Sequence, residues 1–95
     1  MVVGVGTIKL KLYGVASLKA KRKIVKSMIG RLSAKFNVSI AETGYNDSHE
    51  WAQIGFAMTG NDSRIINGKI DKLFNMADDM GLAYIADTTL EIIHF

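Results

Sequence analysis

The side chains best suited to bind a ligand are basic residues concentrated in one stretch of the chain. Residues 17–36, with the sequence SLKAKRKIVKSMIGRLSAKF, contain seven lysines and arginines. Ammonium and guanidinium groups bind phosphate oxygens, so this composition indicates contact with a nucleic-acid backbone. The alternative is that these charges only keep one face of an amphipathic helix in water. The candidate nucleic-acid-binding residues are Lys19, Lys21, Arg22, Lys23 and Lys26, with Lys9 and Lys11 upstream.

Charge is distributed unevenly along the chain. Residues 1–40 contain nine basic and no acidic residues, whereas residues 41–95 contain three basic and nine acidic residues. The two parts therefore carry +9 and −6, which together give the net charge of +3. Such segregation is typical of a protein that binds a polyanion, and it would also let the two parts attract each other within the fold.

The basic stretch is predicted to form a helix. Ser17 is a good N-cap, and Asn37 is expected to end the helix in a left-handed turn. Apolar residues from Leu18 to Phe36 recur at a spacing of three to four and are predicted to face the core. Lys21 projects beside this stripe, and its long side chain is expected to reach water. Because cations in the first turn oppose the helix dipole, we expect a demand other than helix stability to have placed them.

Several classes of chemistry find no support in the sequence. Without cysteine there is no disulfide, thiolate metal site or cysteine nucleophile, which fits a reducing cytosol. Asp47, His49 and Glu50 cluster in a predicted turn, but a metal site needs three or four converging ligands, so no metal is expected. The serines lack a histidine and an acid at a spacing that would predict a nucleophilic triad. We therefore expect no catalytic residues, no cofactor and no small-molecule substrate, and the interpretation leans away from an enzyme.

Length and hydropathy predict a single domain over residues 1–95 in the cytoplasm. A chain of 95 residues, of which 48% are hydrophobic, can build a modest core. The N-terminal residues lack a basic segment ahead of an apolar run, so no signal peptide is predicted. No apolar run reaches the roughly 18–20 residues that a membrane span needs, so no membrane partner is expected.

Hydrophobic periodicity predicts six elements. Period-two alternation indicates strands and three-to-four spacing indicates helices. The order β-α-β-β-α-β is the ferredoxin-like pattern. It predicts an α+β fold with a four-stranded antiparallel sheet of spatial order 4-1-3-2 and two helices on one face, which leaves the other face open. The predicted elements are strands at 2–12, 38–45, 51–59 and 84–93, and helices at 17–36 and 63–80.

The open face of the sheet is predicted to carry an apolar patch. Strand 1 is expected to run parallel to strand 3 and antiparallel to strand 4, which would bring the starts of strands 1 and 3 together. Exposed apolar patches usually mark association, so a homodimer is expected. A base-stacking surface is the alternative, although the central strands lack aromatic residues at the positions where RNA-recognition sheets carry them. The candidate oligomer-interface residues are Val3, Val5, Tyr45, Trp51 and Ile93.

Several motifs together resemble the YlxP-like family of small bacterial proteins of unknown function. The similarity covers essentially the whole chain. Three departures stand out, because Ala20 replaces a common acidic residue, Gly6 replaces a larger apolar residue and Trp51 replaces a polar or basic one. The motifs are Ser17-Leu18-Lys19-x-Lys21-Arg22, Val25-Lys26-Ser27, Arg31-Leu32, the run 36–42 (FNVSIAE), Ile54-Gly55-Phe56-Ala57 and Asn61-Asp62.

The resemblance implies a ferredoxin-like fold, in agreement with the periodicity. Genes of some family members lie beside translation and ribosome-maturation genes, which implies a role near RNA or the ribosome. The resemblance carries over Lys19, Lys21, Arg22, Lys26, Arg31, Asn37 and Glu42 as positions of the family pattern.

The leading hypothesis is a cytoplasmic homodimer whose basic first helix contacts RNA or the ribosome. The alternative is a structural or protein-interaction module, also homodimeric, that has no nucleic-acid role and whose charged helix only faces water.

Overall fold

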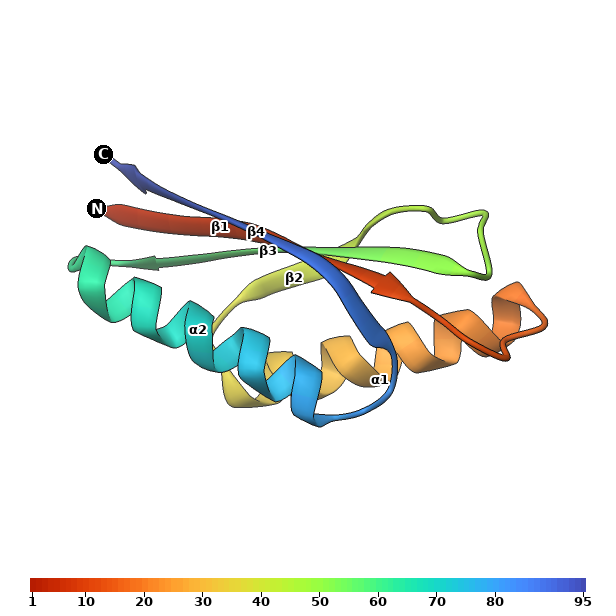
Figure 1. Ribbon diagram of the computed structural model, residues 1–95. Coiled ribbons are helices and arrows are strands. Elements are labelled where there is room, and N and C mark those ends of the chain that lie inside the picture. Colours follow the sequence, from red (N-terminus) through yellow and green to blue (C-terminus); the bar gives the residue numbers. More distant parts are fainter.

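The computed structural model describes residues 1–95 and contains the six predicted elements in the predicted order (Figure 1). The prediction of an α+β, ferredoxin-like fold is confirmed. The elements are β1 (Val2–Lys11), α1 (Leu18–Lys35), β2 (Ser39–Gly44), β3 (Trp51–Gly60), α2 (Ser63–Asp79) and β4 (Tyr84–His94).

The four strands form one antiparallel sheet in the order β2-β3-β1-β4, as predicted, and both helices lie on one face of it (Figure 1). The expectation that β1 runs parallel to β3 is wrong, because the two pair antiparallel from Val2 opposite Gly60 to Lys11 opposite Trp51. The reason is topological. The crossover through α1 makes β1 and β2 parallel, and β3 follows β2 through a hairpin, so β3 opposes both.

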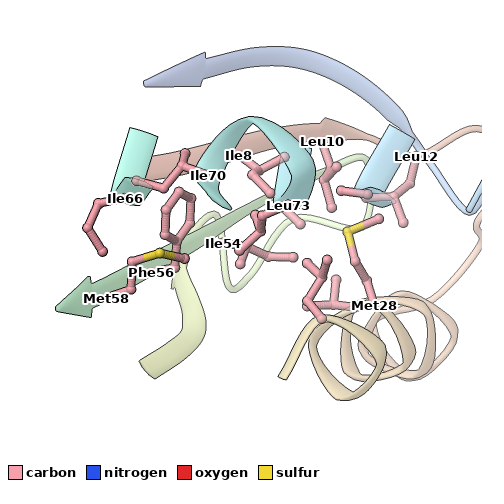
Figure 2. Close-up of a cluster of buried hydrophobic side chains, with 14 of the residues drawn as sticks. Ile8, Leu10, Leu12, Met28, Ile54, Phe56, Met58, Ile66, Ile70 and Leu73 are labelled. Carbon is pink, nitrogen blue, oxygen red and sulfur yellow. The ribbon is translucent and has the colours of Figure 1, made fainter. Parts of the chain in front are cut away.

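The core lies between the sheet and the two helices. Every second residue of β1, and of β3 as far as Met58, is buried, which confirms the predicted alternation. Figure 2 shows these strand side chains packed against Met28 of α1 and against Ile66, Ile70 and Leu73 of α2. The predicted apolar stripe of α1 therefore faces the core.

The structure confirms the predicted start of α1 but not its predicted end. The Ser17 hydroxyl accepts a hydrogen bond of 3.1 Å from the amide of Ala20, so the predicted N-cap is confirmed. The left-handed turn expected at Asn37 is wrong. The chain leaves the helix through Phe36 in an extended conformation, and only Tyr45, Gly14 and Gly81 have positive φ. Neither helix combines the length and apolar character needed to cross a membrane.

Candidate nucleic-acid interface

Four basic residues form one exposed face on the N-terminal half of α1. Lys19, Arg22, Lys23 and Lys26 are all exposed, and none of them forms an ion pair. At about 100° per residue they fall within an arc of about 100°, which points away from the buried stripe. We call these four residues the α1 cationic face. It offers unneutralised positive charge to solvent.

One residue of the α1 cationic face, Lys19, lies in the first turn, where the helix dipole disfavours a cation. The first turn of α1 contains no acidic residue. The N-terminal end of a helix carries partial positive charge, so Lys19 in this turn raises the energy of the folded state slightly. An anionic partner would remove this cost.

Lys21 departs from the prediction. Its side chain is fully buried, so it does not reach water and is not part of the exposed cationic surface. The ammonium nitrogen donates hydrogen bonds to the carbonyl oxygens of Tyr45 (2.8 Å) and Trp51 (3.2 Å). The reason is that the β2–β3 hairpin lies over the first turn of α1 and covers the side chain. Lys21 therefore anchors the hairpin to the helix and is unavailable to bind phosphate.

The burial of Lys21 is balanced by a carboxylate. Oε2 of Glu42 lies 3.3 Å from the Lys21 ammonium, although it accepts no hydrogen bond of good geometry. The Tyr45 carbonyl, which also accepts from the amide of Ser48, belongs to a residue with φ of 59°. A buried charge needs such partners, because an unpaired one would cost several kcal/mol.

Lys9 and Lys11 lie on the open face of the sheet, on the opposite side from α1. Both ammonium groups are 4.7 Å from the centroid of the Trp51 ring, and Lys9 is also 5.3 Å from that of Tyr45. Lys11 forms an ion pair of 3.1 Å with Glu50. These two lysines therefore belong to a second cationic site, which includes aromatic rings and is separate from the α1 cationic face.

The predicted apolar patch is divided between the two ends of the open face. Because β1 and β3 are antiparallel, Val3 lies opposite Thr59 and Ile93, whereas Trp51 lies opposite Lys11. Val3 and Lys11 are eight positions apart, which corresponds to about 26 Å along a strand. Val3, Val5 and Ile93 therefore share one end of the sheet, and Tyr45 and Trp51 share the other.

A family model for proteins of unknown function, DUF503, matches residues 3–90. The chain belongs to the DUF503 family. Over 55 residues, 58% of the chain, it is 38% identical to the uncharacterized protein YlxP of Bacillus subtilis (strain 168). That match spans 60% of the YlxP sequence. The resemblance to the YlxP-like family is thus confirmed.

Solved structures similar to this DUF503 protein bear on its fold alone. The de novo designed protein Foldit4 matches with a TM-score of 0.53 and 10% identity, over 99% of this chain and 97% of the other. A REP-associated tyrosine transposase bound to a REP hairpin matches with a TM-score of 0.46 and 12% identity, over 98% of this chain and 56% of the other. The second likeness is too weak to support an argument.

The structure explains two positions of the family pattern, Lys21 and Glu42. Lys21 and Glu42, both carried over from the resemblance, form the buried ion pair of this DUF503 protein. Lys19, Arg22 and Lys26, also carried over, remain exposed. The pattern therefore combines residues that anchor the hairpin with residues that are free to bind a partner.

A third basic site was missed from the sequence. Lys35 at the end of α1 and Lys69 and Lys72 on α2 line a groove of about 310 Å³ with Phe36, Asn37, Met58 and Thr59. No local motif signals this groove, because its lysines come from two helices far apart in the chain. No group of three or more histidine, aspartate or glutamate side chains is placed to hold a metal ion.

Proposed function

We propose that this DUF503 protein is a cytoplasmic RNA-binding module that contacts RNA or the ribosome through the α1 cationic face. The observation that carries the proposal is the set of four exposed, unpaired cations at Lys19, Arg22, Lys23 and Lys26. Their charges are not used within the fold, and that of Lys19 opposes the dipole of its own helix. The phosphate groups of RNA would neutralise these charges. The proposed location is the cytoplasm because an RNA-binding module has to meet its RNA there.

The four cations match a short run of phosphates. Lys19 and Lys26 are seven residues apart, which is about 10 Å along a helix. Binding would release counterions, so the affinity should fall with salt at a logarithmic slope of about −3 for four phosphates of a single strand. The resemblance to the YlxP-like family is consistent with a partner near the ribosome, because genes of some members lie beside translation and ribosome-maturation genes.

Reversal of three charges on the α1 cationic face tests the proposal. We expect the variant Arg22→Glu/Lys23→Glu/Lys26→Glu to bind mixed-sequence RNA at least about tenfold more weakly than the parent and with a smaller salt slope. The measurement is fluorescence anisotropy between about 50 and 200 mM salt. Thermal unfolding would show that the fold is retained, since these side chains are exposed.

The variant Lys35→Glu/Lys69→Glu/Lys72→Glu is the matched control. It changes the net charge by the same amount at a different surface. If both triple variants weaken binding equally, only the total charge matters and the α1 cationic face has no special role. Parent-like binding by the first triple variant would refute the proposal directly.

A homodimeric interaction module with no nucleic-acid role is the second candidate function. It is favoured by the apolar end of the open face, where Val3 lies opposite Ile93 and Val5 lies beside them. The exposed side chains of Met1 and Phe95 are at the same end, where the two chain termini meet. A second copy could cover this area without bringing the lysines of the other end together.

A single substitution tests the dimer. Val5 lies opposite Glu91, so the change Val5→Lys creates a favourable cross-strand pair and should not unfold the sheet. We expect the parent to be a dimer by light scattering and the variant to be a monomer at the same concentration. A parent that is monomeric at every concentration used would exclude this interface.

A further inference from the structure

All tyrosines and the single tryptophan of the chain gather at one end of the sheet, with Tyr13 in the loop that follows β1. The register places Trp51 and Tyr84 on either side of Lys11, on neighbouring strands. The Tyr45 ring lies 6.3 Å from the Trp51 ring, and the Tyr13 ring lies 5.8 Å from the Lys11 ammonium. We call Tyr13, Tyr45, Trp51 and Tyr84 the aromatic corner.

The aromatic corner is accessible. Tyr13, Tyr84 and Tyr45 are 73%, 60% and 44% exposed, and Trp51 is half-buried between its neighbours. Both helices cover the other face of the sheet (Figure 1), so neither of them lies over the rings of the open face. Large exposed aromatic side chains are costly in water unless a partner covers them.

Cations are interleaved with the rings. The ammonium groups of Lys9 and Lys11 lie within 4.7 Å of the Trp51 centroid, at a distance typical of a cation–π contact. Of these two lysines only Lys11 has an acidic partner, the exposed Glu50. The corner therefore combines flat apolar surfaces with positive charge, and a second copy of the chain would be repelled by the same charges across a two-fold axis.

We infer that the aromatic corner stacks the unpaired bases of single-stranded RNA, an inference that rests on the proposed RNA binding. Every base has a π-face, and base stacking on aromatic side chains needs no particular sequence. Bases within a duplex are already stacked on each other and are not available. Lys9 and Lys11 contact the phosphates that flank the stacked bases.

The corner and the α1 cationic face belong to the same end of the molecule. The Lys21 ammonium, in the first turn of α1, holds the carbonyls of Tyr45 and Trp51. Figure 1 shows the β2–β3 hairpin and the start of α1 at this common end. An RNA strand whose bases stack on the aromatic corner continues over the β2–β3 hairpin, so that its phosphates reach the α1 cationic face.

The sole tryptophan reports directly on stacking. We expect oligouridine to quench Trp51 fluorescence in the parent protein, and an RNA duplex of equal length not to do so. The variant Tyr45→Ala/Tyr84→Ala should bind oligouridine about 5- to 150-fold more weakly with an unchanged salt slope. The variant Tyr45→Phe/Tyr84→Phe retains the rings and should bind as the parent does.

The outcomes separate this inference from the proposed function. If the parent binds RNA and the α1 triple variant does not, but single strand and duplex bind equally without quenching, the aromatic corner has no stacking role and the proposed function stands. Equal loss in the alanine and phenylalanine variants also overturns stacking, because the rings are then not what binds. Quenching that persists in the α1 triple variant at the same RNA concentrations as in the parent supports the corner and overturns the role of the α1 cationic face.

Discussion

Replacement of Lys21 by methionine is expected to lower the free energy of unfolding by about 3–5 kcal/mol. The side chain is fully buried, and its ammonium is the partner of two carbonyl oxygens and of the Glu42 carboxylate. Methionine fills most of the volume but leaves the carboxylate with no positive charge beside it. The Trp51 carbonyl also loses its side-chain donor. The measurement is the urea midpoint, with the slope checked for two-state behaviour.

Two comparisons isolate the cause of this loss. Lys23→Met removes the same charge two residues later on the exposed side of α1, and we expect a change of less than about 0.5 kcal/mol. The double variant Lys21→Met/Glu42→Met removes both buried charges and should recover much of the stability. A Lys21→Met protein as stable as Lys23→Met would show that the buried pair contributes nothing.

The same change has a consequence for binding. Lys21 is the polar link between α1 and the hairpin that carries Tyr45 and Trp51. Its loss should therefore loosen the aromatic corner while leaving the α1 cationic face exposed.

Gly6→Val is expected to destabilise the protein by about 2–3 kcal/mol, although valine favours strands more than glycine does. A Cβ at Gly6 would overlap the backbone carbonyl of Thr89 and would lie 2.6 Å from Cζ of Phe56. A flexible side chain could move aside, but the carbonyl belongs to β4 and can shift only with its strand. Strand propensity predicts that Gly6→Val stabilises the protein, whereas packing predicts that it destabilises it. Thermal or urea unfolding gives the sign of the change in the free energy of unfolding.

Gly30→Ala is the matched control for this substitution. Nothing lies within 4 Å of a Cβ built at Gly30, which is within α1. Alanine should stabilise a helix interior by about 0.5–1 kcal/mol relative to glycine. If Gly6→Val also stabilises the protein, β4 yields more easily than the packing suggests. The close approach of Phe56 and Thr89 explains why a glycine stands at this inward-facing position of β1.

Local patterns were enough to predict the elements and the core. Alternation along β1 and three-to-four spacing along α1 and α2 depend only on neighbours in the chain, and the structure confirms both. The fold class followed from the order of these elements. The order also implied that β3 runs antiparallel to β1. Because a parallel arrangement was predicted instead, residues from two separate ends of the sheet were assigned to one apolar patch.

The composition of the candidate site, by contrast, depends on contacts between distant residues. Lys21 was grouped with the other cations because residue type and helical position do not show that Tyr45 and Trp51, 24 and 30 residues away, place their carbonyls over it. The aromatic corner and the groove at Lys35, Lys69 and Lys72 likewise combine residues from separate elements. Periodicity reports which side of an element is apolar, whereas burial of a charge and the meeting of side chains depend on how the hairpin, sheet and helices pack together.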